Sequence, residues 1–215
     1  MKPKHEISMF ALLLMIICIL IGCAGKVDYS RPISPIGAEN SVTLNKSKAE
    51  VWKKIVPALG KQFFVINNLD KDSGIINVSY KGDPEKYVDC GQLTVKNASG
   101  EITYDFPASK AYQEYEDRNE YGLFRIKRTM DLDGRMNIIV EEIAPNKTRV
   151  TVNTRYMLTK KSDVFDVQGR SRVITDSMSF NSGQQGTFAS GKKSVTCQCN
   201  GNLEKEVLSL LLDKP

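Results

Sequence analysis

Histidine is the residue that this sequence most nearly lacks: 215 residues contain one, His5, and also one tryptophan. His5 lies in an N-terminal segment with the pattern of a cleaved signal. A mature chain without histidine has no Ser-His-Asp or Cys-His nucleophile, and it lacks the most common ligand of transition metals. We therefore expect a protein that is not an enzyme and that holds no metal and no cofactor. An enzyme that uses carboxylates, Tyr, Lys or Cys199 is the least favoured alternative.

No strong excess of charge or low-complexity bias is present either. Hydrophobic residues make up 41% of the chain, charged residues 26%, and the net charge is +5. This composition excludes a disordered, collagen-like or coiled-coil chain. The net charge is too small to indicate nucleic-acid binding. The basic residues, among them Arg128 and Lys160, are scattered along the chain, so we expect them to be solvent exposed.

The N-terminus has the pattern of a secretory signal. Lys2 and Lys4 precede an apolar run, Met9–Ile21, that is shorter than the roughly 20 residues of a membrane-spanning helix. The run ends in Leu-Ile-Gly-Cys, which resembles the lipobox of bacterial lipoproteins. The sequence therefore predicts a signal peptide at residues 1–22 and lipidation of Cys23. An uncleaved membrane anchor with a chance cysteine is the alternative.

Lipidation would place the protein on a membrane, because several acyl chains on one cysteine anchor a chain stably. By resemblance to bacterial lipoproteins, Ala24 favours the outer membrane, with the protein facing the periplasm. Residues 24–40 contain two Pro and two Gly and no apolar period, so we expect residues 23–40 to be the lipidated cysteine and a flexible tether. Residues 41–215 are then expected to form a single domain.

Three cysteines remain in the predicted mature domain: Cys90, Cys197 and Cys199. An exported chain meets an oxidising environment, where one internal disulfide can form. Cys197 and Cys199 would point the same way on a strand, which disfavours a bridge between them. Cys90 bonded to either one would close a loop of more than 100 residues, and we expect such a bridge. Three free thiols are the alternative. A zinc site is disfavoured because a fourth ligand is missing.

Two segments predict helices. Ser47-Lys-Ala-Glu50 has the spacing of a capping box, and the apolar residues that follow it have helical spacing to about residue 62. A second helix is expected over residues 200–212. Between them we expect antiparallel strands, with turns at Asp133-Gly134 and Pro145-Asn146. Residues 107–120 are expected to be an exposed helix or mobile loop, and residues 159–172 a loop.

These elements predict an α+β fold: one curved antiparallel sheet with an N-terminal and a C-terminal helix packed on one face. The element order resembles the helix-grip fold.

A cysteine pattern resembles that of uncharacterised Gram-negative lipoproteins. It joins Tyr87-Val-Asp-Cys90-Gly91 with Cys197-x-x-x-Gly201-x-Leu203-Glu204. Those proteins have Ser and Thr where this chain has Cys199 and Asn200. The resemblance implies that Cys197 is the partner of Cys90 and that Cys199 is the unpaired thiol.

The segment of residues 49–78 loosely resembles the repeated domain of BamC, a lipoprotein of the outer-membrane β-barrel assembly machine. The matching residues are Ala49-x-x-Trp52, Phe64-Val-Ile, an Asp-rich turn and Gly74-x-Ile76-x-Val78. The resemblance implies a non-enzymatic protein that binds partner proteins of the cell envelope, with outer-membrane protein assembly as the process.

The sequence thus predicts a lipid-anchored binding or scaffold protein that faces the periplasm. Its expected partners are the membrane, through Cys23, and envelope proteins. The alternative is a carrier that holds a small apolar ligand or lipid in a helix-grip cavity.

Overall fold

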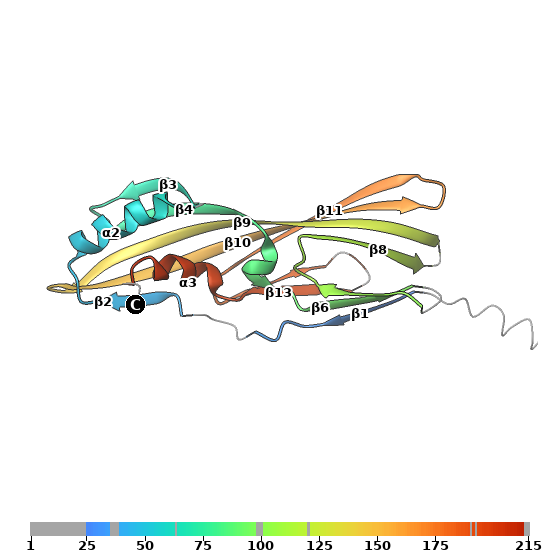
Figure 1. Ribbon diagram of the computed structural model, residues 1–215, viewed down its shortest axis with the longest axis horizontal. Coiled ribbons are helices and arrows are strands. Elements are labelled where there is room, and N and C mark those ends of the chain that lie inside the picture. The colour runs from blue at the N-terminus through green and yellow to red at the C-terminus, as the bar shows by residue number, and fades with distance from the viewer. Residues whose placement is uncertain are drawn as a thin grey trace, which may run out of the picture.

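The computed structural model describes residues 25–34, 39–62, 64–97, 101–119, 121–189, 191 and 193–212. The predicted signal peptide and Cys23 lie outside these residues. The described chain forms thirteen strands, two α-helices and one 3₁₀ helix (Figure 1). In chain order they are β1 (Lys26–Ser30), β2 (Ser41–Leu44), α2 (Lys48–Gly60), β3 (Val65–Asp70), β4 (Ile75–Gly82), η1 (Pro84–Lys86), β5 (Val88–Asp89), β6 (Gln92–Lys96), β7 (Thr103–Pro107), β8 (Tyr112–Asn119), β9 (Gly122–Ala144), β10 (Lys147–Asp166), β11 (Ser171–Asn181), β12 (Gln185–Phe188), β13 (Val195–Cys199) and α3 (Asn202–Ser209).

A long hairpin of β9 and β10 runs the length of the molecule (Figure 1). The two strands pair antiparallel from Ala144 and Lys147 at the turn to Phe124 and Asp166 at the other end. The predicted turn at Pro145-Asn146 is therefore confirmed. Asn146 has a φ of 55°, and asparagine is one of the few residues that adopt this left-handed conformation readily.

The neighbours of this hairpin differ between its two ends. Near the turn, β4 pairs with β9 and β3 pairs with β4, while β2 pairs with β10. Toward the other end, β8 pairs with β9, and β11 pairs with β10. One seven-stranded antiparallel sheet results, and the long hairpin is the part that both ends share.

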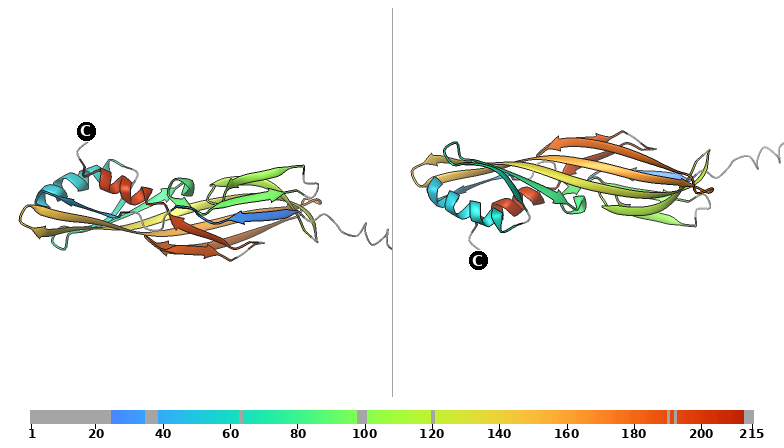
Figure 2. Two further views of the ribbon diagram at one scale, coloured as in Figure 1. Left: turned by 90° about the horizontal axis from the view of Figure 1, so that it is seen from below. Right: turned by 90° about the horizontal axis from the view of Figure 1, so that it is seen from above.

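Two helices cover the end near the turn (Figure 2). The capping box at Ser47 and Glu50 is confirmed and begins α2, which buries Val51, Ile55 and Leu59. Helix α3 packs against β10. Beneath the helices, even-numbered residues of the hairpin such as Ile138, Val140, Val150 and Val152 are buried, as the alternation of side chains along a strand requires.

Two small sheets cover the other end. One has the order β1-β6-β7 and the other β12-β13-β5. Their inward side chains include Val95, Phe106 and Phe188, each about 1% exposed. The core of this end therefore lies between sheets, whereas the core of the other end lies between a sheet and helices.

A disulfide joins Cys90 to Cys197. In the ladder of β5 with β13, Val88 lies opposite Cys199 and Asp89 opposite Gln198, so the next position places Cys90 opposite Cys197. This register settles which late cysteine is bonded, and the expected bridge is confirmed. Cys199 has a free, buried thiol.

The predicted α+β helix-grip fold is wrong. Strands dominate the described chain and form three antiparallel sheets, not one curved sheet. The two helices cover only the end near the turn, because the small sheets occupy the inner face at the other end.

Three segments that were expected to be irregular contain strands. Residues 107–120 include β8, and residues 159–172 include the last part of β10 and the start of β11. In the segment expected to be a tether, residues 26–30 form β1, which pairs antiparallel with β6 from Lys26–Lys96 to Ser30–Gln92. The predicted turn at Asp133-Gly134 lies in the middle of β9.

Removal of the disulfide by the double substitution Cys90→Ser and Cys197→Ser is expected to lower the free energy of unfolding by about 3–5 kcal/mol, since the bridge closes a long loop. Chemical denaturation measures this change. The matched control is Cys199→Ala, which removes a buried thiol without opening a loop and should cost about 1 kcal/mol. Equal losses in the two proteins, or alkylation of Cys90 in the unreduced chain, would contradict the pairing.

Candidate functional site: an apolar cavity between the sheets

A cavity of about 620 Å³ lies at the end of the molecule that has no helices. One wall is the inner face of the large sheet, where β8, β9, β10 and β11 lie side by side. The opposite wall comes from β1, β6, β12 and β13. A volume in this range, about 300–1,000 Å³, is typical of small-molecule sites.

Apolar side chains form most of both walls. On the large sheet they include Phe124, Ile126, Val164 and Ile174, and opposite them lie Val27, Leu93, Val95, Phe188 and Val195. Val164 lies directly opposite Ile126 in the β9–β10 ladder. These are the same even-numbered positions that fill the core under the helices, so one inward face continues from the core into the cavity.

Arg128 of β9 is a cation in this inward row. It is 3% exposed and lines the cavity. Its guanidinium donates hydrogen bonds to the carbonyl oxygens of Ala108 and Lys110 and lies 6.0 Å from the ring centre of Phe106. Burial lowers the pKa of Arg128. Within the described residues Arg128 forms no ion pair. The charge of Glu85 raises the pKa of Arg128, but burial lowers it by more, so the buried charge is only partly compensated, a costly arrangement.

Lys160 of β10 lies beside Arg128 on the same inward face. Ser162 is the residue opposite Arg128, and Lys160 is two positions from Ser162. The Nζ of Lys160 is 3.7 Å from a carboxylate oxygen of Asp176 and 4.7 Å from the ring centre of Phe188. Burial lowers the pKa of Lys160, and the neighbouring charge of Arg128 contributes to the same shift.

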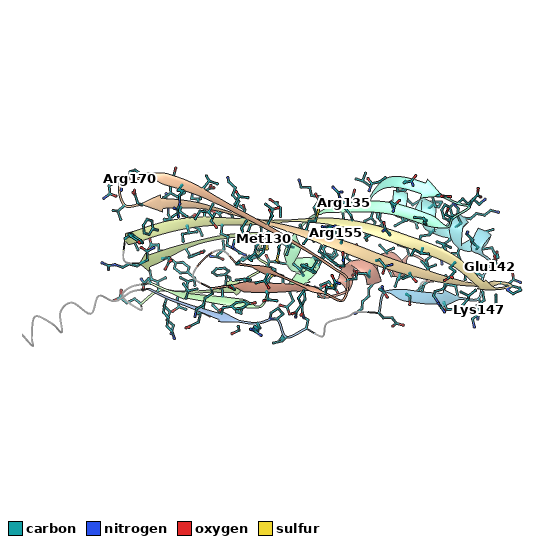
Figure 3. The ribbon with its side chains drawn as sticks, turned by 180° about the vertical axis from the view of Figure 1, so that it is seen from behind. Met130, Arg135, Glu142, Lys147, Arg155 and Arg170 are labelled. Carbon is teal, nitrogen blue, oxygen red and sulfur yellow. A yellow bond between two sulfur atoms is a disulfide. The ribbon has the colours of Figure 1, made fainter. Side chains whose placement is uncertain are left out.

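The cavity has a cationic lining overall. Besides Arg128 and Lys160, three further basic side chains line it, against two carboxylates, Asp117 and Asp166. In Figure 3, Met130, two residues from Arg128, lies near the middle of the molecule, and Arg170 lies at its end. The cavity thus extends from two buried cations near the middle to the turns at the end, and its polarity suits an apolar chain with an acidic group.

Asp89 fixes the wall that β1 contributes. Its carboxylate accepts hydrogen bonds from the backbone N–H and hydroxyl of Ser34, at 3.2 and 2.7 Å, and from the N–H of Gly91 at 2.8 Å. Burial raises the pKa of Asp89, but these hydrogen bonds together outweigh burial, so the net pKa is lowered. Tyr29 of β1 also donates to the carbonyl oxygen of Thr196. The segment that follows Cys23 is therefore held against the disulfide-linked sheet.

A second buried polar cluster lies between β10 and α3. Glu204 is 1% exposed, and it accepts hydrogen bonds from the hydroxyls of Tyr156 and Ser182 at 2.6–2.8 Å. Burial raises the pKa of Tyr156, and also that of the Cys199 thiol nearby. A raised pKa disfavours the reactive thiolate. Neither Glu204 nor Cys199 lines the cavity, so this cluster attaches α3 to the sheet.

The structure tests some of the predicted site residues and not others. Cys90 and Cys197 are joined, whereas Cys23 lies outside the described residues. Over the ranges that the structure describes, no group of three or more His, Cys, Asp or Glu residues is arranged to hold a metal. Within the same ranges, no helix is long and apolar enough to cross a membrane. Lipidation, localisation and envelope partners stay predictions.

The cavity residues were not predicted. Arg128 was expected to be solvent exposed, and the polar run that contains Lys160 and Ser162 was expected to be a loop. The only signal in the sequence is the alternation of side chains along a strand: Arg128 and Lys160 have even numbers, like the apolar residues that face inward on their strands.

Asp89→Asn is expected to lower the free energy of unfolding by on the order of 1 kcal/mol near neutral pH, because hydrogen bonds to a carboxylate become hydrogen bonds to a neutral amide. Since the net pKa of Asp89 is lowered from 3.8, its contribution exists above the unfolded-state pKa and disappears as the pH falls through the folded-state pKa. The difference between the two proteins should therefore shrink in acid. Denaturation at a series of pH values measures it.

The control is Asp28→Asn, which removes an exposed carboxylate 3.0 Å from Lys26 on the same strand. This change should have little effect at any pH. A loss for Asp89→Asn that stays constant from pH 7 to acid would contradict the role given to the charged carboxylate.

Comparison of the chain with models of known protein families, with curated protein sequences and with solved structures returns no match. The resemblances to BamC and to Gram-negative lipoproteins are neither supported nor contradicted by this result.

Proposed function

We propose that this protein is a lipid-anchored binding protein of the cell envelope whose cavity takes an amphiphile with an acyl chain and an acidic group. The observation that carries the proposal is the cavity of about 620 Å³ with apolar walls and the buried, only partly compensated charge of Arg128.

The walls favour a flexible hydrocarbon chain. Each methylene group that leaves water for such a cavity contributes about 0.8 kcal/mol. A chain of a dozen or so methylene groups therefore contributes about 10 kcal/mol, from which the cost of ordering the chain is subtracted. The two walls belong to different sheets, so a chain between them contacts side chains on both sides.

The charges favour an acid. Arg128 has five N–H donors, and the two carbonyl contacts neutralise none of its positive charge. An acidic group beside Arg128 would compensate that charge and accept charge-assisted hydrogen bonds, which are roughly twice as strong as neutral ones. Lys160 stands next to Arg128 and adds to the attraction.

The anchor comes from the sequence, where Leu-Ile-Gly-Cys23 ends an apolar run. Binding of envelope proteins stays a prediction from the sequence. The cavity favours the small-ligand alternative, although in a fold other than the helix grip.

Filling the cavity is expected to weaken binding of a fatty acid. In Ile126→Trp the indole occupies the space between the walls, so displacement of a fluorescent fatty acid by hexadecanoic acid should weaken at least about tenfold, equivalent to 1.4 kcal/mol. The control is Ile139→Trp, on the outward face of the same strand, where Ile139 is 37% exposed. Unchanged binding in Ile126→Trp, with both variants folded by circular dichroism, would refute the proposal.

Arg128 is expected to select the acid over the neutral alcohol. Wild-type protein should bind hexadecanoic acid about tenfold or more tightly than hexadecanol, because a hydrogen bond to a charged group contributes about 1.5–3 kcal/mol. Arg128→Met should lose that preference and still bind the alcohol. This variant should remain folded, since an apolar side chain replaces a buried charge. The control is Arg135→Met on the outward face of β9 (Figure 3). Retention of the preference in Arg128→Met would contradict the role of this residue.

A further inference from the structure

The cavity reaches two neighbouring turns at the end of the molecule. One joins β8 to β9, and the other joins β10 to β11. Phe124 pairs with Asp166, which brings the two turns side by side. Tyr121 and Arg170, which belong to these turns, and Asn119, the last residue of β8, line the cavity. Because these exposed turns contribute to the lining, we infer that the mouth of the cavity is at this end of the molecule, where Arg170 lies in Figure 3.

Exposed apolar side chains gather at this mouth. Tyr121 is 81% exposed, Val167 70%, Val173 55% and Leu123 38%. Tyr121 precedes Gly122, the first residue of β9, and Val167 follows Asp166, the last residue of β10. Leu123 and Val173 lie close to the turns, at the adjoining ends of β9 and β11. Four such side chains at one end of the molecule indicate an interaction surface, and tyrosine is enriched where proteins meet the headgroup region of membranes.

Basic residues surround these side chains. Besides Arg128 and Lys160, which line the cavity, residues 121–128 contain two basic residues and no acidic one, and residues 160–173 contain three basic and two acidic ones. Arg125 also lies 3.6 Å from the carboxylate of Glu114 on β8. Both acidic residues of the second segment have partners, since Asp166 pairs with Arg170 at 2.6 Å and Asp163 with Lys161 at 3.3 Å. Arg125 and Lys127 lie over the ring of Phe165, at 5.4 and 5.9 Å from its centre. The surface thus combines exposed apolar side chains with a small excess of basic residues, which suits a surface of anionic lipid.

The chain also enters the fold at this end. The backbone of Gly25 packs against the backbone of Lys96 and Arg118, and Arg118 pairs with Leu123 beside the β8–β9 turn. Cys23 precedes Gly25 by two residues in the sequence, so the predicted lipidation site comes directly before the point where the chain enters this end of the fold. An acyl anchor on Cys23 would therefore attach to the membrane at the mouth of the cavity.

We propose that the two turns form a membrane-docking surface, so that the mouth of the cavity faces the lipid surface to which the protein is anchored. The surface consists of Tyr121, Leu123, Val167 and Val173 with the basic residues around them. The docking surface rests on the proposed function only for the identity of the ligand that enters the mouth. If that ligand has an acyl chain, the chain passes between the bilayer and the cavity without crossing water.

Tryptophan fluorescence tests the docking surface, because Trp52 is the only native tryptophan and lies in α2 at the opposite end. The full chain, purified from membranes, carries Trp52→Phe with either Tyr121→Trp or Val65→Trp. Val65 is 62% exposed on β3, far from the mouth, and serves as the matched control. The proteins are reconstituted in vesicles of phosphatidylethanolamine and phosphatidylglycerol whose acyl chains are brominated, which quenches tryptophan in the bilayer.

We expect quenching of the Tyr121→Trp protein by about twofold or more and little quenching of the Val65→Trp protein, since only the first tryptophan reaches the membrane interface. Equal quenching of the two proteins, at any level, would overturn the proposal. If Trp52→Phe unfolds the chain, the comparison is made with Trp52 retained and the parent protein as baseline.

The two proposals fail separately. Quenching of the Tyr121→Trp protein without binding of hexadecanoic acid would leave the docking surface and remove the acyl ligand. Binding of hexadecanoic acid together with equal quenching of the two proteins would leave the acyl ligand and remove the docking surface. Replacement of phosphatidylglycerol by phosphatidylcholine should reduce the quenching, because the basic residues then lose their attraction to the surface.

Discussion

The pairing of β9 with β10 is the constraint on which the rest of the structure depends. The ladder has one register from Asp166 to Thr148, so every even-numbered residue of both strands faces inward and every odd-numbered residue faces out. A slip of one residue would expose Ile138, Val152 and Tyr156 and turn charged residues into the core. At the turn end, this inward face is closed by helices. At the other end it is faced by two small sheets, one of which carries the disulfide between Cys90 and Cys197 beside its β5–β13 ladder, and there the two layers leave a cavity.

The end near the turn is the part that the sequence predicts best. Ser47 and Glu50 mark the start of α2, and the alternation from Val150 to Tyr156 predicts a strand with one buried face, because local hydrogen bonding and hydrophobic burial determine both features. Gly134 shows where this reasoning fails. Asp133-Gly134 has the composition of a turn, yet a Cβ at Gly134 would lie 3.2 Å from the side chain of Leu203 in α3. Glycine leaves room there for the side chain of Leu203, which only the tertiary structure reveals.

The cavity end could not be predicted because its inward positions are polar. Arg128, Lys160 and Ser162 interrupt the hydrophobic alternation that identifies a half-buried strand, so the end of β10 has the composition of a loop. The polar inward residues that make the strand difficult to predict also give the cavity its cationic lining. Inward positions that serve packing are mostly apolar, with Thr148 and Thr154 as buried polar exceptions. Inward positions that face the cavity are partly cationic, and a buried cation whose charge is only partly compensated favours an acidic ligand.

The most direct test of an acidic amphiphile between the sheets is native mass spectrometry of the protein released gently from its own membranes. Wild-type protein should carry one lipid-sized mass in addition to any acyl groups on Cys23, and fragmentation should identify an acidic group on it. The Ile126→Trp protein should lack this mass. Wild-type protein without the adduct, or the same adduct on the filled variant, would contradict a ligand in the cavity.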